Sequence, residues 1–128
     1  MSKKRKFKEE IRLAIVGSRT FKDRRRFDAH VAQWISAHGQ PSVIISGEEP
    51  NGTDAMAKAY ALENNIPYVG FPPDWRKHGK AAGPRRNQQI VDDCTHVLAF
   101  PSRHGRGTQN SLEKAEVAKR HVTEIAID

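Results

Sequence analysis

Short apolar runs alternate with longer amphipathic segments along this chain. The runs have the length and composition of buried β-strands, because apolar residues fill consecutive positions when both faces of a strand are covered. Such strands are predicted at residues 11–19, 42–46, 66–71, 96–100 and 122–127. Between them apolar residues recur at helical spacing, which predicts helices at residues 23–38, 53–64, 84–94 and 108–120.

Each predicted helix has one apolar face that should pack against the sheet. The inward residues are expected to be Phe27, Val31, Trp34 and Ile35 in the first helix, Ala55, Met56, Ala59 and Leu62 in the second, Ile90, Val91 and Cys94 in the third, and Leu112, Ala115 and Ala118 in the fourth. Residues 72–84 are expected to form a loop.

The regular alternation of strands and helices predicts an α/β fold. We expect a single Rossmann-like three-layer domain over residues 11–128, with a mostly parallel five-stranded sheet covered by helices on both faces. The crossovers should be right-handed. A length of 128 residues fits one domain.

The chain carries a net charge of +7, and part of this excess lies at the start of the sequence. The first ten residues, MSKKRKFKEE, hold five Lys or Arg and two Glu. We expect residues 1–10 to form a basic disordered tail, with weak contact to nucleic acid as its alternative role.

Other features of the sequence exclude several classes of protein. No apolar run reaches the length of about 18 residues that a membrane span needs, so no membrane partner is expected. No apolar segment directly follows the basic start, so we expect no secretory signal. The single Cys94 excludes an internal disulfide and fits a cytoplasmic location. The loop histidines lack metal-ligand spacing, so we expect no metal site, and no cofactor is predicted.

The loops that follow the strands are the candidate binding segments, because open parallel sheets bind ligands outside the carboxyl ends of their strands. The first such loop contains Gly17, Ser18 and Arg19. Glycine permits close approach of a ligand to the backbone, the serine hydroxyl can bond phosphate or ribose, and the arginine can bind phosphate oxygens. A plain turn is the alternative interpretation.

The second loop follows the run VIIS and contains Ser46, Gly47, Gly52, Thr53 and Asp54. The start of the following helix offers free amides and the positive end of a helix dipole. Asp54 would suit a ribose hydroxyl or a structural bond better than a phosphate. The alternative is that Thr53 or Asp54 simply caps the helix.

The third loop, FPSRHGRGTQNS, is the better candidate for a phosphate-binding loop. Gly105, Gly107 and Thr108 combine free amides with a hydroxyl, beside two arginines. Between the second and third loops lies a basic segment with three more candidates, Trp75, Arg86 and Asn87. The tryptophan could stack on a base, cover the site or pack in the core. The asparagine could read a base edge or hold a loop.

Five segments, in this order, resemble the YspA/YpsA-related SLOG family: VGSRTFKD, ISGEEPNGTDAMAKAYA, FPPDWRKHGKAAGPRRNQQIV, HVLAF and GRGTQNSLEKA. The resemblance covers residues 11–127, and the segment from Trp75 to Asn87 is its most distinctive part. It implies a Rossmann-like sheet with a nucleotide-type pocket at the strand ends, and a homo-oligomer. The wider superfamily is similar to phosphoribohydrolases of the LONELY GUY type, to DNA-processing protein A, which binds single-stranded DNA, and to sensors of NAD-derived or ADP-ribose-like signals.

The resemblance to the phosphoribohydrolases is incomplete. Arg86 resembles the arginine that opens their helix before the fourth strand, and the glycine–threonine loop ending at Thr108 resembles their phosphate loop. However, Ser111 stands where those enzymes carry a glutamate, and serine cannot act as a carboxylate does. The loop at residues 101–105 is longer than theirs, and SGEEPNG replaces their usual glycine–alanine turn.

Three functions follow from these observations. The first is binding of a nucleotide or nucleotide-derived ligand, such as an ADP-ribose-like, NAD-like or cyclic nucleotide signal, by a sensor or sequestering protein that is not an enzyme. The second is N-glycosidic hydrolysis of a nucleoside monophosphate, with Asp54 and Arg86 as candidate catalytic residues. The third is binding of single-stranded nucleic acid, which the charge and Trp75 favour and the low aromatic content of 7% opposes.

Overall fold

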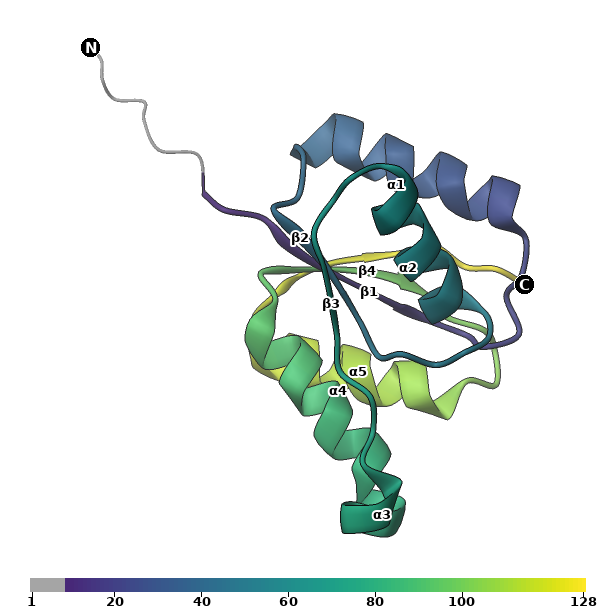
Figure 1. The fold of residues 1–128 in the computed structure, drawn as a ribbon, viewed down its shortest axis with the longest axis vertical. Coiled ribbons are helices and arrows are strands. Elements are labelled where there is room, and N and C mark those ends of the chain that lie inside the picture. Colours follow the sequence, from purple (N-terminus) through teal and green to yellow (C-terminus); the bar gives the residue numbers. More distant parts are fainter. Residues whose placement is uncertain (1–8) are drawn as a thin grey trace.

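The computed structural model describes residues 9–128, which form one five-stranded sheet in which every strand pair is parallel. In spatial order the strands are β3 (Tyr68–Gly70), β2 (Val43–Ser46), β1 (Arg12–Gly17), β4 (His96–Phe100) and β5 (His121–Glu124). The predicted α/β architecture is therefore confirmed, with a sheet that is fully parallel (Figure 1). The tail prediction falls mainly on residues 1–8, which lie outside the described residues.

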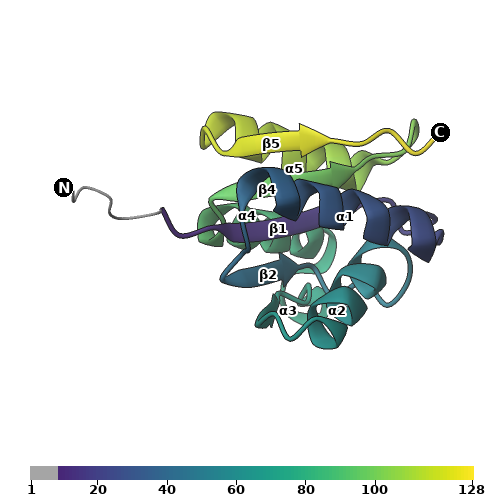
Figure 2. The same ribbon diagram turned by 90° about the horizontal axis from the view of Figure 1, so that it is seen from above.

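Helices cover both faces of the sheet (Figure 2). On one face lie α1 (Arg24–His38) and α2 (Thr53–Glu63), and on the other lie α4 (Ala82–Asp93) and α5 (Arg106–Val117). Alternate residues of β1 serve the two layers: Leu13 and Ile15 pack with α1 and α2, whereas Ala14 and Val16 pack with α4 and α5. The central strands are thus buried on both sides, as their continuous apolar sequences predict.

Two sequence expectations about the helices are wrong. Residues 72–84 are not a plain loop, because they contain helix α3 (Trp75–His78), a 3₁₀ turn (Gly79–Ala81) and the start of α4. Asp74 makes this possible by accepting a hydrogen bond from the Lys77 amide at 3.0 Å, which caps α3. α5 similarly begins at Arg106, before the predicted Thr108.

The buried face of α2 also differs from the prediction. Leu62 is 64% exposed. Met56 is buried as predicted, whereas Ala55 and Ala59 are only half-buried. The other buried residues are Thr53, Ala57, Tyr60 and Ala61, which follow helical spacing on an adjacent face. The small alanines let the helix approach the sheet, and the Tyr60 ring packs edge-on against Phe27 at 6.4 Å between ring centroids. Among the described residues, no helix is long and apolar enough to cross a membrane.

The contrast between two leucines tests this packing. Leu98 is fully buried in β4, whereas Leu62 is exposed. Leu98→Ala should lower the free energy of unfolding by about 2–5 kcal/mol, because it leaves a cavity in the core. Leu62→Ala makes the same chemical change at the surface and should change it by about 0.5 kcal/mol or less. Urea denaturation measures both; equal losses would contradict the packing of α2.

Candidate functional site

The carboxyl end of β1 is joined to α2 and β4 by a compact set of hydrogen bonds. The Ser18 carbonyl accepts from both the amide of Thr53 at 3.1 Å and its hydroxyl at 2.8 Å. The Ser18 amide donates to the Phe100 carbonyl at 3.0 Å. A Cβ added at Gly17 would lie 2.6 Å from Thr53 Oγ1 and 2.7 Å from Phe100 O, so only glycine fits there. The junction therefore holds three segments in contact at the strand ends.

The first loop also fits directly against the start of α2. The hydroxyl groups of Ser18 and Thr20 are 2.7 Å apart and hydrogen-bonded. Gly52 has a φ of +74°, and a side chain there would overlap the backbone of Arg19. Gly52 is the N-cap of α2, and no side chain caps this end. The helix-capping interpretation of Thr53 and Asp54 is therefore wrong, since their side chains bond to neighbouring loops.

The second loop brings an arginine and a carboxylate to opposite sides of a glycine. The Arg86 guanidinium reaches from α4 and donates to the Gly47 carbonyl. Asp54 Oδ2 accepts from the Glu49 amide at 3.1 Å. A Cβ added at Gly47 would lie 2.5 Å from Arg86 Nη1 and 3.0 Å from Asp54 Oδ2. The absence of a side chain at Gly47 thus lets the two charged groups approach each other.

The environment of Asp54 changes its acidity. Burial raises the pKa of Asp54 to about 6, although the Glu49 amide, the Arg86 charge and the nearby Ser46 hydroxyl oppose this rise. Ser46 is fully buried, and its Oγ has no well-formed hydrogen bond to any described residue. The site therefore contains a carboxyl group that titrates near neutral pH, next to a buried hydroxyl.

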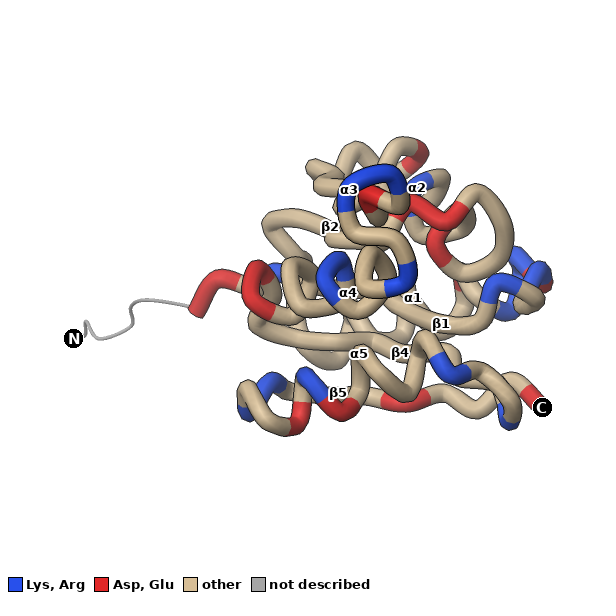
Figure 3. The backbone as a smooth tube through the Cα atoms, turned by 90° about the horizontal axis from the view of Figure 1, so that it is seen from below, with Lys and Arg blue, Asp and Glu red and all other residues tan. Residues whose placement is uncertain are grey.

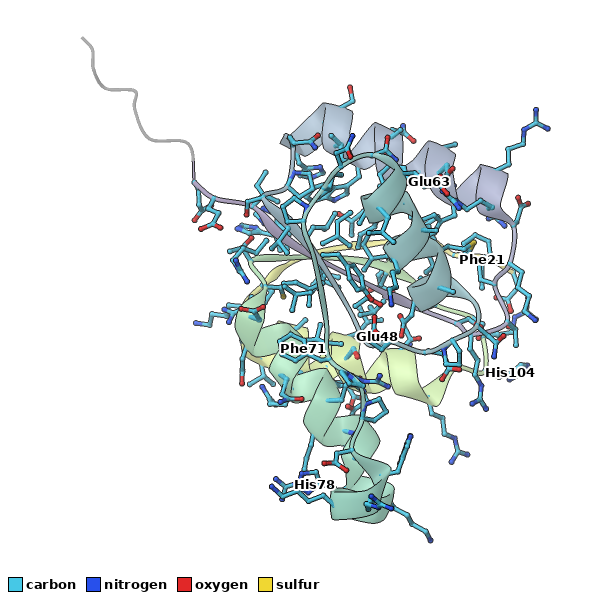
Figure 4. The ribbon with its side chains drawn as sticks, in the orientation of Figure 1. Phe21, Glu48, Glu63, Phe71, His78 and His104 are labelled. Atoms are coloured by element: carbon cyan, nitrogen blue, oxygen red, sulfur yellow. The ribbon has the colours of Figure 1, made fainter. Side chains whose placement is uncertain are left out.

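A second carboxylate, Glu48, is held by partners that the sequence analysis did not identify (Figure 4). Tyr68 in β3 donates its hydroxyl hydrogen to Glu48, and Lys58 Nζ lies 3.5 Å from the other carboxylate oxygen. Burial, followed by the hydrogen bond to Glu48, raises the pKa of Tyr68. Glu48 itself has a φ of +64°, and its side chain lies over Gly70. These partners are not neighbours of Glu48 in the sequence, so a short sequence motif cannot predict the contacts.

Asn87 links the second loop to the third. Its Oδ1 accepts from Arg86 Nε at 2.8 Å, and its Nδ2 donates to Asn110 Oδ1 at 3.0 Å and to the Gly107 carbonyl at 3.4 Å. Asn87 is only 7% exposed. Its side chain therefore connects Arg86 to the first turns of α5.

The third loop leads into α5 beside an open depression of about 570 Å³. Arg103, His104 and Arg106 line it together with Gly105 and, from α5, two amide side chains and the Glu113 carboxylate. His104 lies at the edge of the molecule in Figure 4. Gly105 is the N-cap of α5, and no side chain caps this end. Basic side chains and uncapped amides therefore occur together here.

The predicted site residues fall into two groups. The residues of the first group are connected by the strand-end junction, by the contacts around Gly47 and by the hydrogen bonds of Asn87. This group comprises Gly17, Ser18, Arg19, Gly47, Gly52, Thr53, Asp54, Arg86, Asn87 and Gly107. Ser46, Gly105 and Thr108 lie beside these in the same loops. Trp75 is separate, because it lies on α3 and is 59% exposed. Within the described residues, no group of three potential ligands could hold a metal ion.

The raised pKa of Asp54 predicts a pH-dependent stability. The pKa of about 6 in the folded state exceeds the ordinary aspartate value of 3.8, so the folded state holds the proton more tightly. The free energy of unfolding should therefore fall as pH rises between these values. Asp54→Asn removes the cost of burying an ionised carboxylate. It should therefore raise the free energy of unfolding at about pH 7.5 by about 1–3 kcal/mol, with no gain near pH 4.

Urea denaturation across this pH range measures the effect. Asp92→Asn, which makes the same change at an exposed position of α4, is the matched control and should give no such gain. A loss of stability in Asp54→Asn that is equal at both pH values would contradict the assignment, since the carboxylate would then be stabilising.

Comparisons with known proteins agree with this fold. The chain is 31% identical over 113 residues to the gene 61 protein of Mycobacterium phage D29, which covers 84% of this chain and 90% of that protein. Its fold is similar to the crystal structure of DNA processing protein A (DprA) from Streptococcus pneumoniae, with a TM-score of 0.72 at 20% identity. That match covers 93% of this chain but only 51% of the DprA chain.

A sequence model of one family covers the first two strand-end loops. The model of the YspA, cpYpsA-related SLOG family matches residues 11–78, which is more than half of the chain. This confirms the family resemblance drawn from the five segments. The chain belongs to the YspA, cpYpsA-related SLOG family.

Proposed function

We propose that this protein binds a nucleotide or nucleotide-derived ligand at the carboxyl edge of its sheet. The observation that carries the proposal is the placement of Arg86 and Asp54 on either side of Gly47. Asn87 extends the same contact to Gly107, at the start of α5. Hydrogen bonds thus connect a cation near a carboxylate to an uncapped helix start, and together these groups suit a ligand with both phosphate and sugar hydroxyl groups.

The two ends of this surface suit different parts of such a ligand. The phosphate would bind at the start of α5, where Arg103 and Arg106 line the open depression and the first helix amides lack intrahelical partners. The ribose would bind near Asp54, whose ionised carboxylate accepts hydrogen bonds from hydroxyl groups. Ser18 and Arg19 would form the opposite wall. ADP-ribose-like, NAD-like and cyclic nucleotide signals present these groups.

We further propose a sensor or sequestering role, in a homo-oligomer in the cytoplasm. Ser111 is 3% exposed and offers no carboxylate at the position where the related hydrolases have one. The structural neighbour is a DNA processing protein, which is compatible with a polynucleotide partner, because a polynucleotide carries the same phosphate and sugar groups.

The second candidate function is N-glycosidic hydrolysis, and the acidity of Asp54 favours it. Burial raises the pKa of this carboxyl to about 6, in the range where a general acid or base works at neutral pH. Asp54 would then act on the glycosidic bond, while Arg86 would hold the phosphate.

Binding and hydrolysis can be separated in one experiment. Near-stoichiometric protein is incubated with AMP, GMP, CMP, NAD, ADP-ribose and cyclic nucleotides, and free and bound compounds are quantified by liquid chromatography and mass spectrometry. We expect one compound to be depleted and recovered intact from the denatured protein. Release of free base and sugar phosphate, abolished by Asp54→Asn, would instead establish the hydrolase.

Arginine variants test where the ligand binds. Arg86→Gln should weaken binding at least about tenfold, because a charge-assisted hydrogen bond contributes about 1.5–3 kcal/mol. Arg85→Gln is the matched control, since Arg85 is the exposed neighbour on the same helix, and its affinity should stay close to the parent value. Equal effects of the two variants, or depletion of no compound by the parent protein, would contradict the proposal.

A further inference from the structure

A short arm projects from the end of the domain beyond the sheet (Figure 1). We define the arm as residues 74–85, which comprise α3, the following 3₁₀ turn and the first turn of α4. The proposed nucleotide site uses no side chain of this segment, because these side chains lie outside the contacts that join the strand-end loops. Its amino-acid composition nevertheless differs from that of a segment that only connects a strand to a helix.

The arm concentrates exposed positive charge. Arg76, Lys77, Lys80 and Arg85 are all exposed. None of the four forms a salt bridge with a described residue. The arm contains a single acidic residue, Asp74, whose carboxylate accepts from the Lys77 amide. Figure 3 shows these basic positions on α3 and at the start of α4. The cations are therefore free to meet an anionic partner.

The arm also exposes a large aromatic ring. Trp75 is 59% exposed, whereas Trp34 is 4% exposed and donates to Thr123 Oγ1 at 3.3 Å. The Trp75 ring lies beside Gly83, where an added Cβ would come within 3.7 Å of its Cη2 atom. The other exposed large apolar residues described, Leu62, Val117 and Val122, lie on other elements. An exposed indole among cations is suited to stacking on a planar group.

An open depression of about 520 Å³ continues from the arm along α4. Lys77, His78, Arg85 and Arg86 line it together with the amides of Gln88 and Gln89 and the carboxylates of Asp74 and Asp92. His78 lies at the tip of the arm in Figure 4. This groove offers several cationic and hydrogen-bonding groups in succession, as an extended polyanion requires.

We propose that the arm binds single-stranded nucleic acid, with backbone phosphates on its lysine and arginine side chains and an unpaired base stacked on Trp75. Stacking on the exposed indole needs an unpaired base, which a duplex does not offer. Anionic membrane is the less suitable partner, because α3 has four residues and no apolar face to insert. Arg86 borders both surfaces, but the test of the arm is separate from that of the nucleotide site, because it alters no residue of that site.

The test uses the full chain and a fluorescent oligothymidylate of about 12 nucleotides, with binding measured by anisotropy at several salt concentrations. The triple variant R76Q/K77Q/K80Q should bind at least tenfold more weakly and reduce the slope of log affinity against log salt by about 2, since each phosphate contact contributes about 0.7. Trp75→Ala should weaken binding at least about fivefold, and Trp75→Phe should restore part of the affinity.

The matched control is K22Q/R25Q/K119Q, which removes the same charge from exposed positions outside the arm. It should change affinity less than about threefold. Tryptophan fluorescence gives a second readout: the oligonucleotide should quench the parent protein but not Trp75→Ala, in which only the buried Trp34 remains. Thermal unfolding checks that each variant is folded.

Several outcomes would overturn the proposal. Equal losses in the two triple variants would mean that net charge, not the arm, determines binding. Equal affinity for a duplex of the same length would exclude stacking on an unpaired base. Binding to phosphatidylserine vesicles without oligonucleotide binding would identify a membrane surface instead. Failure of the nucleotide panel would leave the arm result unaffected.

Discussion

The candidate site depends on one shared acceptor, the carbonyl oxygen of Ser18. Both hydrogen-bond donors of Thr53 bind it, so the end of β1 and the start of α2 are fixed together inside the protein. Thr53 is fully buried, where an unpaired donor would be costly, and this makes the arrangement hard to replace. Gly17 is required for the same reason, since any side chain would displace the threonine hydroxyl.

This junction determines where the charges of the site lie. With the start of α2 fixed, Asp54 is held beside the second loop and is buried enough for its pKa to rise. Arg86 approaches from α4, on the other face of the sheet, and reaches the same loop at Gly47. Glu48 is meanwhile held by Tyr68 and Lys58. The carboxyl ends of β2 and β3 are therefore acidic, while the loop before α5 is basic.

α4 connects the two surfaces that we assign to ligands. Its first turn belongs to the basic arm, and its second turn carries Arg86 and Asn87 into the strand-end site. Asn87 is buried and bonds to both Arg86 and Asn110, so the orientation of the arginine is coupled to the start of α5. One rigid helix can in this way carry an exposed interaction surface and a buried positioning contact.

The sequence by itself determined the α/β architecture, because apolar runs in buried parallel strands and helical periodicity are local properties. It also placed the three loops at strand ends, and it predicted Arg86 and Asp54 as site residues, both of which lie next to Gly47 in the structure. It misplaced Leu62 because the alanine-rich face of α2 and its neighbour have similar periodicity, and only the sheet selects one. The contact of Tyr68 with Glu48, the link from Asn87 to Asn110 and the acidity of Asp54 were decided by tertiary structure. Each depends on burial or on contact between residues that are far apart in the chain, and a local sequence pattern contains no information about either.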